Sequence, residues 1–269
     1  MHRLYADRLV YILSHIQLIE HVTDSIDDNA DRHMGDENVA TISEMLKELT
    51  ESCGSIGLTM AAKQADRARN YVLESKEATK TLQGLLLEVR RRFVDELDGR
   101  IVLCLSSDRS KYFSDDGKSF STYALDSFPS SSYDAIEAGK CLALGRATSC
   151  VIHLMRVLEI GLGNLSLSLG LQMATKNWNV ILDQIEAEIR RRSNATHGPK
   201  WKDEDEPFFA EAATHFRLLK NAWRNHAAHA RAKYTDEEAE EIYASVRAFM
   251  RHLAKRLCEP ALPSPGASS

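Results

Sequence analysis

The sequence predicts an all-α protein in which a C-terminal antiparallel four-helix bundle follows an N-terminal helical region. Three observations support this fold class. Apolar residues recur at steps of three and four through most of the chain, glycine and proline separate the periodic segments, and a capping signal precedes the last segment. Only one short run, residues 101–105, favours a β-strand.

The N-terminal helical region covers residues 1–98. Its first apolar stripe consists of Tyr5, Leu9, Ile12, Ile16 and Ile19, and further helices are expected over about 38–53, 58–73 and 77–97. Residues 53–57 contain two glycines and predict a turn, because glycine ends helices and accepts left-handed geometry.

Residues 99–132 predict a connector. They combine the β-favouring run with serine-rich polar sequence and a turn signal at residues 115–117, so the connector has room for a small β-hairpin.

Residues 133–258 predict the four-helix bundle. One long helix is expected over 133–169, with small residues at Gly139, Ala143 and Ala147 that would admit a close neighbour. The next two helices are expected from Trp178 to the arginines at 190–192 and from Pro207 to Trp223, with a loop over 193–206. Thr235 and Glu238 form a capping-box pattern that starts the last helix, and residues 259–269 predict a disordered tail.

The composition indicates an ordinary globular protein rather than a membrane or secreted one. The 269 residues are 43% hydrophobic and 27% charged, and no apolar run reaches the roughly 20 residues of a membrane span. The start of the chain has no signal-peptide pattern, and five scattered cysteines suit a reducing compartment, so we expect a cytoplasmic location. No cysteine pair suggests a zinc site, and no cofactor or metal is expected.

The strongest chemical signal is the stretch from Arg224 to His229, which also contains Asn225 and His226. On a regular helix Asn225 and His229 share one face, whereas Arg224 and His229 are about 140° apart. Arg224 and His229 therefore meet only if the helix end unwinds before Thr235 or if they come from two protomers of a symmetric dimer.

This stretch resembles the HEPN superfamily, whose motif is an arginine and a histidine separated by four to six residues between the third and fourth bundle helices. The block from Glu137 to Arg146, running into 153–159, also looks like the first bundle helix of bacterial HEPN-like proteins. The resemblance covers roughly residues 133–258. It implies a metal-independent endoribonuclease, often a toxin or an anti-phage defence effector, that acts as a homodimer on RNA and is held in check by an antitoxin or another partner protein.

The implied roles agree with the chemistry of RNA cleavage. RNA carries its own nucleophile, the 2'-hydroxyl, and an imidazole can transfer the proton while a guanidinium stabilises charge on the phosphate. His229 would be the general acid or base, Arg224 the phosphate clamp, and Asn225 and His226 supporting residues. The product would end in a 2',3'-cyclic phosphate.

Several residues have an alternative interpretation. Arg224 and His229 could be a structural pair at a helix end, and His226 and His229 could bind a metal together with His215. Arg156 and Glu159 could support the motif or form an ordinary i,i+3 ion pair.

Basic residues near the motif could form an RNA-facing rim, and the candidates are Lys200, Lys202, Lys220, Arg231 and Lys233. The arginine runs at 90–92 and 190–192 have acidic neighbours and favour a solvated, salt-bridged surface over RNA binding.

Two further functions compete with the ribonuclease. The chain could be a catalytically inactive HEPN-like module that binds RNA, a nucleotide or a partner, or its N-terminal helices could make it a structural or regulatory oligomer.

Overall fold

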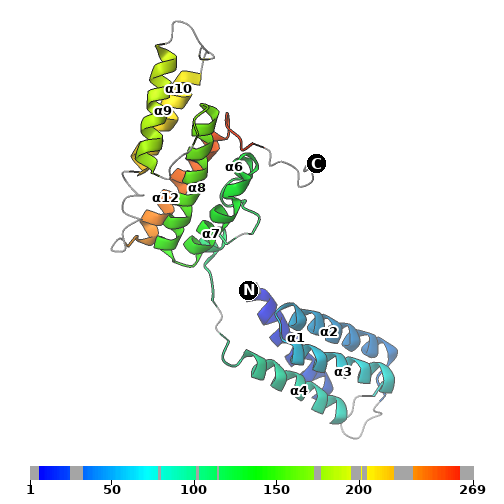
Figure 1. Ribbon diagram of the computed structural model, residues 1–269. Helices are drawn as coiled ribbons and strands as arrows, with labels where there is room; N and C mark the ends of the chain where they lie inside the picture. The colour runs from blue at the N-terminus through cyan, green and yellow to red at the C-terminus, as the bar shows by residue number, and fades with distance from the viewer. Residues whose placement is uncertain are drawn as a thin grey trace, which may run out of the picture. The chain divides into compact units, whose positions relative to one another are not determined.

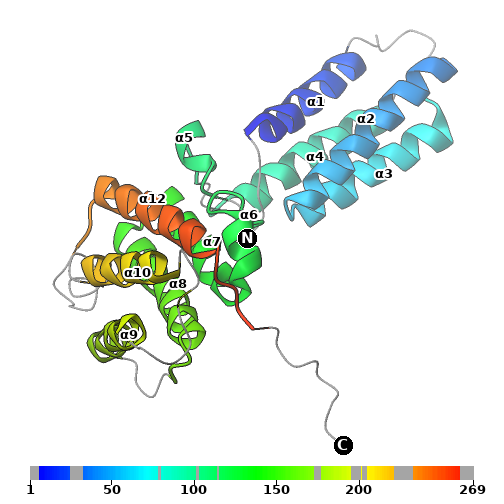
Figure 2. The same ribbon diagram turned by 90° about the horizontal axis from the view of Figure 1, so that it is seen from above.

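The computed structural model describes residues 6–24, 33–77, 80–100, 103–113, 115–172, 177–194, 201, 205–220 and 233–260. These residues are predominantly helical and contain no strand, which confirms the all-α class (Figures 1 and 2). Their only β-type pairing is an isolated bridge between His33 and Glu77. The Arg224–His229 stretch lies outside the described residues.

The chain divides into two compact units, Met1–Leu103 and Cys104–Ser269. Each unit has its own cluster of buried apolar residues. The two units are therefore described separately.

The N-terminal unit consists of four helices, α1 (Ala6–Asp24), α2 (Asp36–Ser55), α3 (Thr59–Ser75) and α4 (Lys80–Leu97). The periodic stripes turn inward as predicted. Ile12, Leu46, Leu49, Leu82 and Phe93 are among the buried residues of this core. Gly57, with a φ of 74°, makes the turn between α2 and α3.

The C-terminal unit contains α5 (Ser107–Ser110), α6 (Thr122–Ser127), η1 (Pro129–Ser131), α7 (Ser132–Ala143), α8 (Ala147–Ser168), α9 (Trp178–Ser193), α10 (Asp205–Leu219) and α12 (Asp236–Leu253). It is therefore more elaborate than a plain set of four helices.

The predicted connector is part of the C-terminal unit. Residues 103–113 and 115–131 contain α5, α6 and η1, and none of them lies in a strand, so the hairpin does not appear there. Phe120, Leu125 and Phe128 from this segment are buried in the core of the unit. Their burial was not predicted from the serine-rich sequence, because so few apolar residues do not show a clear helical or strand periodicity.

The single helix predicted over 133–169 is two helices, which corrects that expectation. Gly145 adopts a φ of 66°, and its N–H donates to the Leu142 carbonyl at 3.1 Å. The Arg146 N–H donates to the Cys141 carbonyl at 2.8 Å. A left-handed glycine with these two bonds ends an α-helix, so α7 stops there and α8 starts in a new direction.

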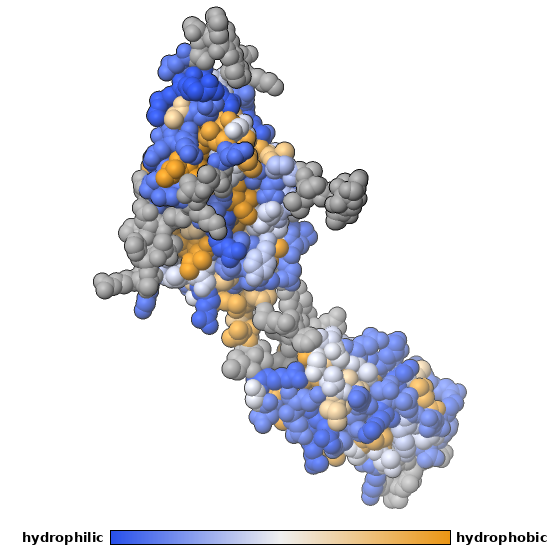
Figure 3. All heavy atoms as spheres, in the orientation of Figure 1, coloured by the Kyte–Doolittle hydropathy of each residue, from blue (hydrophilic) through white to orange (hydrophobic). Residues whose placement is uncertain are grey.

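Helix α8 forms the centre of the C-terminal unit and packs against α7, α10 and α12. It is long and apolar enough to cross a membrane, but 67% of its most apolar window is buried inside the unit, as in the core helix of a soluble protein. Gly161 allows close packing, since an added Cβ would lie 2.9 Å from Met250 Sδ. Figure 3, drawn in the orientation of Figure 1, shows hydrophobic residues in orange over the region where α8, α9 and α12 lie.

Helix α12 begins with the predicted capping box. Thr235 Oγ1 accepts from the Glu238 N–H at 3.2 Å, and Glu238 accepts from the Thr235 N–H at 2.8 Å. Helix α10 begins at Asp205, so Pro207 is its third residue and not its first.

Candidate functional site

The structure describes the residues on either side of the predicted motif. Arg224, Asn225, His226 and His229 lie outside the described residues, as does Arg231. The described flanks are the end of α10 at Leu219 with Lys220, and Lys233–Thr235 before α12.

The flank on α10 lies beside α8. Phe216, in the last turn of α10, packs edge-on against Trp178, with ring centroids 6.0 Å apart. The Trp178 Nε1–H donates to Glu159 Oε1 on α8 at 3.2 Å. The motif is therefore preceded by a turn of helix linked to Glu159 through one buried indole.

The flank before α12 also lies on α8. The Tyr234 N–H donates to Thr148 Oγ1 at 3.3 Å. Thr148 and Glu159 are separated by three turns, roughly 16 Å, on the same face of an α-helix. The connection that carries the motif thus starts and ends along this stretch of α8.

Two of the predicted rim residues are described, and they differ. Lys233 is exposed, as expected of a rim. Lys220 is buried, with 7% of its surface exposed, so it does not belong to an exposed rim. It follows Ala212 and Phe216 at four-residue steps on the inner stripe of α10, which explains its burial.

A buried carboxylate organises the exposed face of α8. Asp134, in the first turn of α7, has a side chain only 7% exposed. His153 Nδ1 lies 2.7 Å from Asp134 Oδ1, and Arg156 Nε lies 3.2 Å from Asp134 Oδ2. One carboxylate therefore holds an imidazole and a guanidinium that are one turn apart on α8.

This arrangement leaves reactive groups facing outward. Because a carboxylate oxygen accepts hydrogen bonds, Nδ1 of His153 is the donor and Nε2 is not used by Asp134. The Arg156 side chain is 58% exposed even though its Nε pairs with Asp134. The ring of Tyr133 lies edge-on to His153 at 6.4 Å. A phosphate is the kind of group that such a histidine and arginine can bind together.

Arg156 and Glu159 do not form the ordinary i,i+3 pair that was one interpretation of their spacing. Arg156 pairs with Asp134, and Glu159 accepts from Trp178. Both residues are on the exposed side of α8. Asp134 and His153 were not predicted as site residues, although His153 belongs to the block that resembles HEPN proteins.

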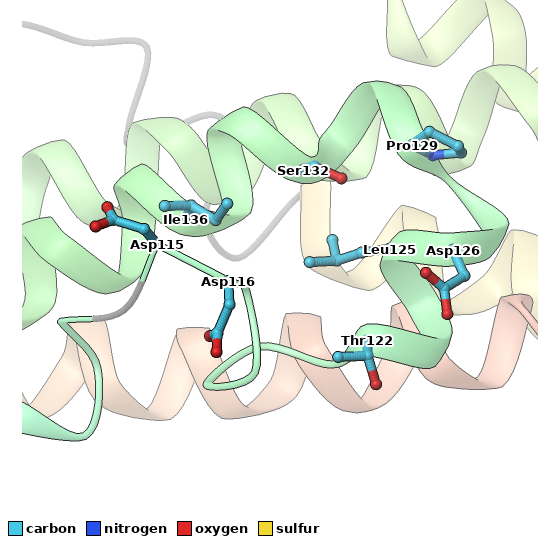
Figure 4. A pocket seen from close by; sticks show the side chains of 8 residues that line it. All are labelled: Asp115, Asp116, Thr122, Leu125, Asp126, Pro129, Ser132 and Ile136. Atoms are coloured by element: carbon cyan, nitrogen blue, oxygen red, sulfur yellow. The ribbon is translucent and has the colours of Figure 1, made fainter.

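A pocket of the C-terminal unit is acidic. A pocket of about 410 Å³ near α6 and α7 is lined by Asp115, Asp116 and Asp126, as Figure 4 shows. Asp115 pairs with Lys140 at 2.9 Å and Asp116 with Lys118 at 2.8 Å. The three carboxylates make this pocket unsuitable for an RNA phosphate.

The remaining candidates have structural roles in the described part of the chain. Burial raises the pKa of Cys150 to about 12 and also raises that of Cys141, so neither is an activated thiol. His215 packs edge-on against Phe249 at 5.4 Å, and the described residues include no group of three metal-binding side chains.

The arginine runs are paired with acidic neighbours, as the sequence favoured. Arg191 and Arg192 each lie 2.7 Å from Glu188, and Arg92 lies 2.8 Å from Glu88. The hydrogen bond from Arg191, with help from Arg192, outweighs partial burial and lowers the pKa of Glu188 to about 2.

No family model, curated protein or solved structure matches this chain. Its function is therefore inferred from its own residues and from the resemblance of its motif.

Proposed function

We propose that this protein is a metal-independent endoribonuclease of the HEPN type that acts as a homodimer. The observation that carries the proposal is the Arg224–His229 motif in the connection between α10 and α12. Support comes from the flanks of that connection, which reach α8 at Thr148 and, through Trp178, at Glu159. The same helix carries His153 and Arg156, which are held by Asp134.

The proposed reaction uses the RNA as its own nucleophile. A base takes the proton of the 2'-hydroxyl, the 2'-oxygen attacks the adjacent phosphorus, and the bond to the 5'-oxygen breaks as an acid protonates it. His229 serves as acid or base, and Arg224 stabilises the charge that develops on the phosphate. Asn225 and His226 support His229. The products are a 2',3'-cyclic phosphate and a 5'-hydroxyl.

The exposed face of α8 is assigned to RNA binding. Arg156 is fixed at Nε by Asp134 and has a largely exposed guanidinium, which suits a contact with a neighbouring phosphate. Ile152, on the same helix, is 45% exposed and offers an apolar contact for a second protomer. A second protomer would bring Arg224 and His229 together without unwinding of the helix end, since the two residues do not share a face of a regular helix.

The biological setting follows from the family resemblance. We assign the protein to the cytoplasm, as a toxin or an anti-phage defence effector that an antitoxin or defence-system partner restrains. Such restraint would limit the damage that an active ribonuclease does to cellular RNA.

The test of the reaction is RNA cleavage by the full chain in the presence of a chelator. We expect cleavage of tRNA, mRNA or rRNA, cyclic-phosphate ends on the products, and no cleavage at a site where the RNA carries a 2'-deoxy nucleotide. Ends bearing a 3'-hydroxyl, or cleavage that needs added metal, would contradict the mechanism.

The dimer and the α8 face have separate tests. If each site takes Arg224 and His229 from different protomers, mixing Arg224→Ala with His229→Ala restores part of the activity that each variant has lost.

Arg156→Gln tests the α8 face and should weaken RNA binding several-fold. Arg91→Gln, a matched change on an arginine that is 74% exposed in the N-terminal unit, should not weaken it.

A catalytically inactive HEPN-like binding module is the second candidate. The net charge of -5 and the burial of Lys220 favour its nucleotide- or partner-binding form, because both reduce the positive surface offered to RNA. Retained binding of RNA, a nucleotide or a partner protein without cleavage of any RNA would support this candidate over the ribonuclease.

A further inference from the structure

A groove between α3 and α4 of the N-terminal unit has the size and lining of a ligand site. Its volume is about 450 Å³, within the range of small-molecule pockets. Helix α3 contributes Met60, Lys63, Gln64 and Arg67, and α4 contributes Gly84, Leu85, Glu88 and Arg92. The one carboxylate of the lining, Glu88, is paired with Arg91 and Arg92. No residue predicted to act on RNA lies in this unit.

The groove contains two cations that no described residue neutralises. Among the described residues, Lys63 and Arg67 are exposed and form no ion pair, and Arg67 Nη1 donates a 3.5 Å hydrogen bond to Gln64 Oε1. Most other surface arginines of this unit have a carboxylate partner, as Arg92 has Glu88. Two unpaired cations one helical turn apart favour an anionic ligand between them.

The floor of the groove has unused hydrogen-bonding capacity. Gln64 is 7% exposed, and its Nε2 donates to the Leu85 carbonyl at 3.5 Å, the outer limit of such a bond. A glutamine amide has two donor hydrogens, so one of them has no partner among the residues that the structure describes. Buried polar groups are normally satisfied, and a ligand oxygen would satisfy this one.

Gly84 keeps the α4 side of the groove open. A glycine within a helix costs roughly 0.5–1 kcal/mol relative to alanine. A Cβ added at Gly84 would meet nothing within 4 Å, so this glycine serves neither close packing nor a left-handed turn. It leaves space where a ligand can approach the helix backbone beside the cations.

The two ends of the groove differ in character. The Met60 and Ala61 N–H groups donate to Glu96, while Gln64 meets Leu85, so α3 and α4 run antiparallel. Arg67 therefore lies toward the Gly84 end, and Met60 lies toward Arg92 at the other end. One end is cationic and open, and the other offers the apolar Met60 side chain beside Arg92, whose guanidinium is paired with Glu88 at 2.8 Å.

We propose that this groove binds a phosphorylated small molecule of about nucleotide size. Lys63 and Arg67 contact its phosphate oxygens, the Gln64 amide donates to one of them, and Met60 and Leu85 contact its less polar part. The assignment concerns the N-terminal unit alone and holds whether or not the C-terminal unit cleaves RNA.

A long nucleic acid fits this surface less well than a small ligand does. Acidic residues outnumber basic ones over α2, α3 and α4 together, so the positive charge is local to the groove. Extended binding of a polyanion instead requires a continuous basic stripe.

The test is isothermal titration calorimetry on the full chain with pyrophosphate, ADP and adenosine as probes. We expect ADP to bind, pyrophosphate to compete with it, and adenosine to show no binding. Lys63→Gln with Arg67→Gln should weaken ADP binding at least tenfold, and Gly84→Leu should weaken it by filling the groove. Lys47→Gln on α2, an equal change of charge at a lysine paired with Glu44, should leave it unchanged.

Circular dichroism of each variant distinguishes a loss of ligand contacts from a loss of folding. Absence of ADP and pyrophosphate binding to the wild type would overturn the proposal, as would equal binding by the double variant. Binding of single-stranded RNA but not ADP, lost in the same double variant, would overturn it in favour of a nucleic-acid surface. If Gly84→Leu unfolds the unit, the two single glutamine variants decide the question.

Discussion

Replacing Asp134 with asparagine tests the cluster that organises the exposed face of α8. Asparagine has a single acceptor oxygen, so it can accept from either His153 or Arg156 but not from both at separate oxygens. Its NH₂ group then lies against the remaining donor, and that interaction is lost. The change also removes a negative charge from the first turn of α7, where it interacts favourably with the helix dipole.

The expected loss of stability follows from the exposure of the partners. Arg156 is 58% exposed, so its pair with Asp134 is worth no more than about 1 kcal/mol. His153 is 22% exposed, and weakening its 2.7 Å bond from charged to neutral costs about 1 kcal/mol. With a few tenths from the helix dipole, Asp134→Asn should destabilise the C-terminal unit by about 2 kcal/mol.

Urea unfolding followed by tryptophan fluorescence measures this loss. All three tryptophans, at 178, 201 and 223, belong to the C-terminal unit, so the signal reports that unit alone. Asp126→Asn is the matched control, because Asp126 is exposed and the change should stay within about 0.5 kcal/mol. Equal effects of the two substitutions would refute the reasoning about Asp134.

Two further predictions concern packing and pH. Gly161→Ala brings a Cβ to 2.9 Å from buried Met250 and should destabilise the C-terminal unit by about 1 kcal/mol. Gly84→Ala adds a Cβ in open space and should stabilise the N-terminal unit by about 0.5–1 kcal/mol. Thermal unfolding followed by circular dichroism measures both changes, which should have opposite signs. The lowered pKa of Glu188 contributes stability that is present above the usual glutamate pKa of 4.5 and is lost as pH falls toward about 2. Glu188→Gln should therefore reduce the dependence of the unfolding free energy on pH between 4.5 and about 2. An unchanged dependence would contradict this role.

The sequence predicted the helices and their buried stripes well, because both depend on local periodicity. The capping box at Thr235 and the inward residues of α9 were predicted for the same reason. The break at Gly145 was missed, since a lone glycine inside an apolar pattern is compatible with a continuous helix.

That one error concealed the Asp134 cluster. On a continuous helix Asp134 and His153 would be roughly 28 Å apart along the axis, with no reason to associate. The turn at Gly145 folds α7 back along α8 and brings the two side chains to 2.7 Å. Contacts of this kind depend on tertiary direction, which hydrophobic periodicity does not encode.

Lys220 could have been interpreted differently from the sequence. It continues the four-residue step of Ala212 and Phe216, so its position on the inner stripe was visible. Its charge and its closeness to the motif favoured a rim, but the helical position decided its burial.

The central claim is that His229 carries out acid–base chemistry on RNA. The most direct test compares cleavage of labelled RNA by the wild type, His229→Ala and a control, His21→Ala, in the presence of a chelator, with dimer content measured by analytical ultracentrifugation. His21 is exposed in the N-terminal unit. The account predicts that His229→Ala remains a folded dimer and loses cleavage by at least a hundredfold, about the contribution of one acid–base group, while His21→Ala keeps its activity. Full cleavage by folded His229→Ala would contradict it.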